Sequence, residues 1–434
     1  MLIRFYVANF LSFADKTEFS MISAKGAHAD DHVVRSNGFG VLRGAVLYGA
    51  NASGKSNLVN AIDLARHMVT DSAKTSSKLI DKRFRPASSD DDTPTHFEFE
   101  FSVAETVYAY GFTFSPTAVH EEWLYVLRGS GEIVVFERDD TGFHLNESLF
   151  RGRDSVKRLE YMFDDLLPTQ LYLTEANTRN IKNISGAEPL IESFRWFMDS
   201  LVIIYPESRF RAWDSIEQDT AFVDAMNRKL REFDTGIDRV SFEERAESDI
   251  PETELPRDFL TDIESKAGQT SVFVFGHDYN TYLIDWPDGK RRIRELCTIH
   301  ETQSGPEMFR MADESDGTKR LTDFIPLYIR GTAAERTFII DEIDRSLHTN
   351  LSTVLVSTLL RSFAGSRSQL ICTTHDTRLM DLELFRRDEI WFVEKDSSGR
   401  SRLHSLNDYR PRRDKDVQKE YLNGRYGGVP VLAE

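Results

Sequence analysis

The chain has 434 residues, a length that allows two or three domains at roughly 150 residues each. Its 54 basic and 71 acidic side chains give a formal charge of −17, which argues against a surface coated all round with nucleic-acid-binding charge but leaves room for a local basic patch. Two cysteines, Cys297 and Cys372, exclude a disulfide framework and fit a reducing compartment.

Apolar residues make up 40% of the chain and charged residues 29%, as in ordinary globular proteins and unlike largely disordered ones. No stretch approaches the roughly 20 apolar residues that span a bilayer. The N-terminus alternates apolar residues and lacks the apolar block and cleavage site of a signal peptide. We therefore expect a cytoplasmic protein with no membrane partner.

The first segment, residues 1–150, combines strands with one helix. Apolar residues alternate over 2–13, and a short apolar run at 45–48 ends in a glycine-rich loop. Leu58, Ile62, Ala65 and Val69 then follow at helical spacing. Residues 97–103 and 108–114 alternate strictly, and a further run lies at 134–136, which predicts an antiparallel meander with one buried face.

The remaining two segments differ in pattern. Residues 151–270 are expected to form a helical insert. Part of it is acidic, because residues 211–270 contain 16 acids and 8 bases, a net −8. Residues 271–296 return to strand alternation around a turn at 287–289. Beyond Thr318, helices alternate with strands at 337–340, 369–374 and 390–393, which indicates parallel βαβ units. The fold class is therefore α/β, with a mixed sheet, an antiparallel β subdomain and a helical insert.

A phosphate-binding loop lies between the expected strand and helix of the first segment. Residues 49–56, GANASGKS, fit G-x-x-x-x-G-K-[ST] in the required context. Glycines let backbone N–H groups close around phosphates, Lys55 can reach the β- and γ-phosphates, and the Ser56 hydroxyl can bind Mg²⁺. A chance glycine-rich turn is the alternative. The expected ATP-binding residues are Gly49, Asn51, Ala52, Ser53, Gly54, Lys55, Ser56 and Asn57.

An acidic pair follows the apolar strand at 337–340. A phosphate-binding loop needs a carboxylate at such a strand end, so Asp341 is expected to hold Mg²⁺ together with Ser56. Glu342 can act as the general base that activates water. The alternative is a pair that caps the next helix. Two successive acids favour a hydrolase over a kinase.

At this point the motifs resemble those of ABC-type ATPases, the branch that includes SMC proteins and RecF. Residues 314–318, ESDGT, resemble a degenerate LSGGQ signature. The resemblance implies that Ser315 and Gly317 contact the γ-phosphate of ATP held by an opposite subunit. A helix cap is the alternative reading of this motif.

Two further motifs extend the resemblance. Residues 343–348 occupy the place of the D-loop, which crosses the dimer interface in that family, with a surface helix start as the alternative. His375 stands where the family has its switch histidine, and a neutral imidazole there could hydrogen-bond the γ-phosphate. The family's Mg²⁺-sensing glutamine has no counterpart between Ser56 and Gln170. Glu175 or Asn177 is our candidate for its place.

More specifically, the sequences NFLSF, YGANASGKSNL, IIDEIDRSLH, FRRDEIWFVEKD and YLNGRYGGVP resemble stand-alone bacterial ATPases of the RloA-like or abortive-infection type, a group that includes the ATPase subunit of the PARIS antiphage system. This resemblance implies an ATP-driven homodimer or higher homo-oligomer, an effector protein such as a TOPRIM nuclease, and a DNA or phage-protein trigger. Only 59 residues follow His375, so we do not expect the nuclease in this chain.

Two other functions stay open. Lys290, Arg291, Arg292 and Arg294 beside Trp286 could contact a phosphate backbone, as in a RecF- or SMC-like ATPase of DNA repair or recombination. A solvated hairpin is the simpler reading of this cluster. A nucleotide-binding scaffold with negligible turnover is the third possibility, and Glu342 argues against it.

Overall fold

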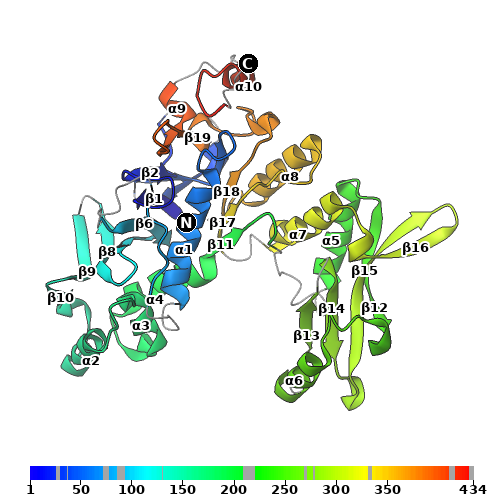
Figure 1. Cartoon of the computed structure of the whole chain (residues 1–434), viewed down its shortest axis with the longest axis horizontal. Helices are drawn as coiled ribbons and strands as arrows, with labels where there is room; N and C mark the ends of the chain where they lie inside the picture. Colours follow the sequence, from blue (N-terminus) through cyan, green and yellow to red (C-terminus); the bar gives the residue numbers. More distant parts are fainter. Residues whose placement is uncertain are drawn as a thin grey trace. The chain divides into compact units, whose positions relative to one another are not determined.

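The computed structural model describes residues 1–25, 30–36, 38–71, 78–85, 93–129, 131–208, 220–267, 271–276, 279–330, 335–409 and 416–429. These residues form two compact units (Figure 1). The first unit contains residues 1–207, 332–344 and 352–434, and the second contains 208–331 and 345–351. This division differs from the three expected segments, because 151–207 joins the first unit and 271–331 joins the second.

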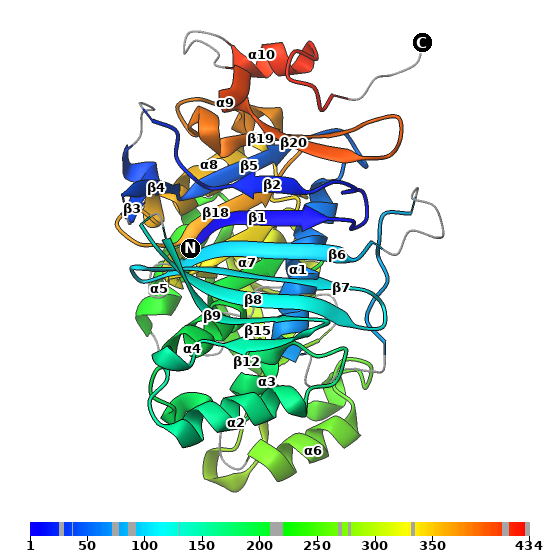
Figure 2. The ribbon, with the colours of Figure 1, turned by 90° about the vertical axis from the view of Figure 1, so that its left-hand side faces the viewer.

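An antiparallel sheet forms one layer of the first unit. Its strand order is β10-β9-β8-β7-β6-β1-β2 among the described residues, and Figure 2 shows its strands lying side by side. The strands are β1 (Leu2–Ala8), β2 (Thr17–Ser20), β6 (Thr95–Val103), β7 (Thr106–Phe114), β8 (Val119–Arg128), β9 (Gly131–Asp139) and β10 (Gly142–Leu145). The predicted meander is confirmed, since each of these strands pairs antiparallel with its neighbour.

The inner face of this sheet is aromatic. Phe97, Phe99 and Phe101 are fully buried, as their alternation with polar residues requires. Phe101 stacks on Trp196 with ring centroids 4.3 Å apart. The same core includes Leu58, Ile62 and other residues of α1 (Lys55–Asp71). The helices α2 (Arg153–Asp164), α3 (Tyr172–Thr178) and α4 (Glu188–Arg195) also belong to this unit.

A second, mixed sheet carries the chain's nucleotide motifs. Its order is β11-β17-β18-β5-β19-β20 within the described part of the chain. The strands are β11 (Leu201–Ile204), β17 (Thr337–Ile340), β18 (Gln369–Thr373), β5 (Gly44–Tyr48), β19 (Ile390–Lys395) and β20 (Ser401–Ser405). All neighbours pair parallel except β19 and β20. The expected parallel βαβ units are confirmed, with α8 (Thr349–Ser362) between β17 and β18.

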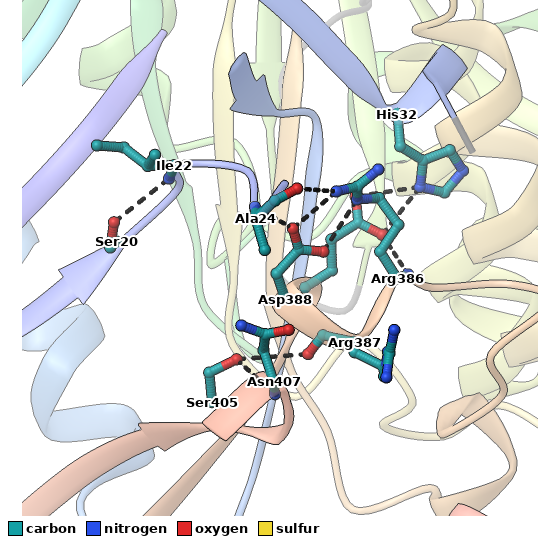
Figure 3. A network of polar contacts seen from close by, with 10 residues as sticks. Ser20, Ile22, Ala24, His32, Arg386, Arg387, Asp388, Ser405 and Asn407 are labelled. Carbon is teal, nitrogen blue, oxygen red and sulfur yellow. Dashed lines mark hydrogen bonds and ion pairs between the residues drawn. The ribbon is translucent and has the colours of Figure 1, made fainter. Parts of the chain in front are cut away.

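A polar network ties the N-terminal segment to the chain just before β19 (Figure 3). The backbone N–H of Ala24 donates to Asp388 at 2.6 Å, and the Arg386 guanidinium pairs with the same carboxylate at 2.8 Å. His32 Nδ1 lies 2.9 Å from the buried Glu389 carboxylate. These contacts join segments that lie more than 350 positions apart in the sequence. Ala24 and Asp388, for example, are 364 positions apart. The first unit also contains β3 (Val33–Ser36), β4 (Phe39–Leu42), α9 (Leu406–Tyr409) and α10 (Val417–Leu422).

The second unit contains its own sheet, of order β12-β15-β14-β13, with β16 paired to β15. The strands are β12 (Ile237–Arg245), β13 (Val272–Phe275), β14 (Thr281–Asp285), β15 (Arg292–Thr302) and β16 (Gly305–Arg310), and the helices are α5 (Thr220–Glu232), α6 (Arg257–Ala267) and α7 (Asp316–Arg330). The segment 151–270, expected to be a helical insert, also contains the strands β11 and β12. Charged residues interrupt the alternation of β12, and pairing with β15 decides its structure.

Candidate nucleotide site

The glycine-rich loop turns sharply between β5 and α1. Ala52 and Gly54 adopt left-handed φ values of 61° and 118°, and α1 begins directly at Lys55. A Cβ added at Gly49 would lie 2.5 Å from the carbonyl oxygen of Val393. Only glycine fits at position 49, because it has no Cβ. The close approach of Val393 therefore explains Gly49, and the positive φ explains Gly54.

Two serines outside the predicted site residues, Ser12 and Ser401, support the loop. Ser401 Oγ contacts Ser12 Oγ at 2.7 Å and the Ser53 carbonyl oxygen at 2.5 Å. Asn57 Nδ2 donates to Ser12 Oγ at 2.7 Å. A Cβ at Gly54 would lie 2.4 Å from Ser401 Oγ. The N-terminal turn and the start of β20 therefore fix the loop from two sides.

Lys55 is buried and its ammonium group closes the loop. Its Nζ donates to the carbonyl oxygens of Gly49 at 2.7 Å and Ala50 at 3.3 Å. Burial lowers the pKa of Lys55, opposed by the charges of Asp341, Glu342 and Asp344. These acids act on the lysine electrostatically although they lie far from it in the sequence.

The acidic pair stands at the end of β17. Asp341 is 4% exposed, and its Oδ1 accepts a 2.6 Å hydrogen bond from Thr373 Oγ1. The same hydroxyl oxygen accepts from the N–H of Glu342 at 2.8 Å. Glu342 has a left-handed φ of 50°, a strained conformation for a residue other than glycine. The next α-helix begins only at Thr349, so the pair does not cap it.

Thr373 contacts both residues of the acidic pair and was not among the residues predicted from the sequence. It stands at the last position of β18, two residues before His375, and a threonine at a strand end carries no motif of its own. Because β17 and β18 are parallel neighbours, their carboxyl ends meet, and the hydroxyl of one strand reaches the acids that follow the other.

His375 joins the same edge of the sheet. Its backbone N–H donates to the Asp344 carboxylate at 3.3 Å. Burial and the positive charge of Lys55 lower the pKa of His375, opposed by Asp344 and the acidic pair. The lowered pKa favours the neutral imidazole, the form that can both accept and donate a hydrogen bond.

The residues present fit a nucleotide and Mg²⁺. Ser53 Oγ is buried in the loop and has no hydrogen-bond partner among the described residues. Ser56 is exposed and Asp341 is near Lys55, which gives a hydroxyl and a carboxylate. Over the described ranges no group of three or more His, Cys, Asp or Glu could hold a metal by itself.

The signature candidate lies in the second unit. Ser315 Oγ accepts from the N–H of Thr318 at 3.1 Å and so caps the start of α7, as the alternative reading expected. A Cβ at Gly317 would lie 2.7 Å from the carbonyl oxygen of Ser346. The signature and D-loop candidates therefore lie against each other, and the required glycine is explained by this contact.

The candidates for the missing glutamine have local contacts. Glu175 forms an ion pair with Arg179 one turn later in the chain. Asn177 Nδ2 donates to the carbonyl oxygens of Leu173 at 2.8 Å and Leu190 at 3.1 Å. Both side chains serve the packing of α3, and their assignment to Mg²⁺ sensing stays a prediction.

The basic cluster of the DNA-binding alternative is largely neutralised. Arg292 and Arg294 both contact Asp285 at 2.6 Å. Arg291 pairs with Glu247 at 2.6 Å and Glu264 at 3.1 Å. Ion pairs of this kind leave little free charge for a phosphate backbone, so the cluster lends the alternative little weight.

A protein-family model described as "AAA domain, putative AbiEii toxin, Type IV TA system" matches residues 45–381. The chain belongs to this family. The match includes the phosphate-binding loop, the acidic pair and His375, and it confirms the abortive-infection type of P-loop ATPase that the motifs resemble. A search of curated proteins finds no match.

Solved structures of SMC heads are similar to this AAA-family chain at 14% identity. The SMC head domain from Thermotoga maritima covers 93% of this chain and 98% of its own, with a TM-score of 0.40. An Smc head domain with an extended coiled coil, bound to the C-terminal domain of ScpA and derived from Pyrococcus furiosus, covers 94% and 99%, with a TM-score of 0.42. Among the described residues, no helix is long and apolar enough to cross a membrane.

Proposed function

We propose that this chain hydrolyses Mg²⁺-bound ATP and acts as a nucleotide-dependent switch or scaffold for an effector protein in antiphage defence. The observation that carries the proposal is the convergence of the loop lysine, the acidic pair and His375 on one sheet edge. The pKa shifts of Lys55 and His375 both register the charges of the acidic pair. The family match supports the same chemistry.

Lys55 is placed to exchange the loop carbonyls for phosphate oxygens. Its present hydrogen bonds to the carbonyl oxygens of Gly49 and Ala50 hold the ammonium against the loop. Ser56 and Asp341 would hold Mg²⁺, which supplies charge neutralisation on the β- and γ-phosphates. The chain's own part is to orient the phosphates through the loop backbone and to exclude water behind the buried lysine.

Glu342 is assigned as the general base. The Thr373 hydroxyl holds its backbone N–H at 2.8 Å, and the strained backbone fixes the direction in which the side chain leaves β17. A carboxylate held in this way can accept the proton of an attacking water. His375, kept neutral, would hydrogen-bond the γ-phosphate and report its loss to the D-loop through Asp344.

The second proposed element is a head-to-tail dimer. Ser315 and Gly317 of one copy would close on ATP held by the loop of the other, so that ATP joins the copies and hydrolysis loosens them. The contact between Gly317 and Ser346 supports a shared signature and D-loop surface for this purpose. An effector, a TOPRIM nuclease being the candidate, would respond to the dimer.

The deciding experiment is the substitution Glu342→Gln. We expect ATP hydrolysis to fall by about 100-fold or more, since general-base catalysis contributes on that order, while ATP binding persists and dimers accumulate. Turnover and light-scattering mass with ATP measure the two effects. Glu383→Gln, an exposed acid of the same unit, is the matched control. Unchanged turnover in Glu342→Gln would refute the assignment of the base.

A RecF- or SMC-like DNA-repair ATPase remains the alternative, because the same nucleotide site serves both functions. Salt-dependent DNA binding that stimulates ATP hydrolysis would favour it. Hydrolysis that is indifferent to DNA but responds to a co-purified nuclease would favour the effector switch.

A further inference from the structure

The outer face of the seven-stranded sheet in the first unit is rich in aromatic and acidic side chains. Strand register places one row straight across it, because paired residues point to the same side. In the described part of this unit no helix covers this face, which Figure 2 shows toward the viewer. The row, from β1 to β10, is Tyr6, Glu98, Gly111, Trp123, Glu137 and His144.

Trp123 packs over its cross-strand neighbour, which is a glycine. A Cβ added at Gly111 would lie 2.3 Å from the Trp123 ring. The indole therefore occupies the space that any other side chain at position 111 would fill. Tyr125 follows on the same side of β8, and the ring of His96 is 5.6 Å from the indole. The result is a partly exposed aromatic platform, formed by His96, Trp123 and Tyr125.

A hollow of about 710 Å³ lies beside the platform, over β8, β9 and β10. Five acids and one arginine line it. Arg138 is already paired with the buried Glu122 at 2.9 Å, and Glu98 is paired with Lys16 at 2.7 Å. Glu121, Glu137 and Asp139 remain. The hollow is therefore strongly acidic, and its floor is aromatic.

A lysine of the chain itself, Lys16, already lies on this face. Lys16 Nζ lies 4.6 Å from the ring centroid of Tyr6 and 2.7 Å from Glu98. One end of the row thus already holds an ammonium between an aromatic ring and a glutamate. Trp123 and Glu137, which are cross-strand partners, present an aromatic ring and a glutamate further along the row. No cation lies over Trp123 among the described residues.

We propose that this platform docks a basic segment of a partner protein, with an arginine or lysine side chain on Trp123 and its charge among the acids of the hollow. Aromatic faces attract cations, and a guanidinium can stack while it binds carboxylates. The acids would repel the phosphates of nucleic acid. No residue of the face belongs to the nucleotide site, so the inference does not rest on ATP hydrolysis.

The test measures binding of a short fluorescein-labelled peptide of alternating arginine and glycine to the full chain by anisotropy, at about 0.15 M salt. Trp123→Ala should weaken binding by about tenfold, the equivalent of one desolvated cation–π contact, without changing net charge. Gly111→Ala should act similarly by displacing the indole. Tyr161→Ala, which removes an aromatic ring 62% exposed elsewhere in the unit, should leave binding unchanged.

A charge series completes the experiment. Glu121→Gln with Glu137→Gln should weaken binding more than Glu147→Gln with Asp154→Asn, an equal charge change on exposed acids outside the hollow. Thermal melts confirm that each variant folds, and ATP turnover should be unaffected. Absence of peptide binding, equal binding by the natural chain and Trp123→Ala, or preference for single-stranded DNA would each overturn the proposal.

Discussion

At the scale of single residues, one hydroxyl organises the acidic end of the nucleotide site. Thr373 Oγ1 donates to Asp341 at 2.6 Å and accepts from the N–H of Glu342 at 2.8 Å. It therefore fixes both the proposed metal ligand and the backbone of the proposed base. Substitution of a residue that holds a metal ligand or a catalytic group in place commonly changes activity, although that residue does not touch the substrate.

Thr373→Val should reduce ATP turnover by about tenfold, or about 1.4 kcal/mol, because the isosteric valine leaves a buried N–H and a carboxylate without this partner. Nucleotide affinity should change much less, since the loop is untouched. Thr373→Ser keeps the hydroxyl and should retain most activity. Steady-state turnover and nucleotide titration measure the two quantities, and equal turnover in all three proteins would contradict the role.

At the scale of elements, the segment before β19 is stabilised by charges that titrate. Burial opposes the charged form of His32, but the hydrogen bond and charge of Glu389 raise its pKa overall. Burial raises the pKa of Glu389, opposed by His32. A raised pKa in either group means that the folded state binds protons more tightly, so stability declines as pH rises through the folded pKa.

The natural chain should accordingly melt at a lower temperature at about pH 8 than at about pH 6. Each kcal/mol lost from the free energy of unfolding lowers the melting temperature by on the order of 2–4 °C. The stabilisation by His32 is complete below its ordinary pKa of 6.5 and is lost above its raised value. The double variant His32→Gln, Glu389→Gln cannot titrate at these positions and should lose this slope. Thermal melts across this range test it, and an unchanged slope would show that other groups are responsible.

At the scale of the whole molecule, the nucleotide motifs are divided between the two units. The loop, the acidic pair and His375 belong to the first, whereas Ser315 and Gly317 belong to the second. Head-to-tail association of two copies, as proposed, would combine the two sets twice in one symmetric dimer.

Mixing two inactive variants tests this arrangement. Lys55→Ala removes the loop ammonium and Ser315→Arg blocks the signature, so each alone should be inactive. A mixture in equal amounts should recover about one quarter of the natural turnover, since half of the dimers are mixed and each has one intact site. Recovery that depends on chain concentration would support the dimer, and an inactive mixture would exclude sites shared between copies.

The sequence by itself determined the local features. The loop between β5 and α1, the strand before Asp341 and the alternating strands β6 and β7 were predictable, because spacing within a few residues sets backbone approach, helix start and buried face. It could also propose roles for Glu342 and His375, because each follows an apolar strand directly. The net charge of −17 did not show that acidic side chains would gather in the hollow over β8, β9 and β10.

Only the tertiary structure decided which distant segments meet. The order β17-β18-β5 brings Thr373 to the acidic pair, and the pairing of β7 with β8 lays Trp123 on Gly111. Ser401, which supports the loop, contacts Ser12, a residue 389 positions away in the sequence. The physical reason is the same in each case: strand pairing and side-chain packing join residues whose separation in sequence leaves no local periodicity to detect.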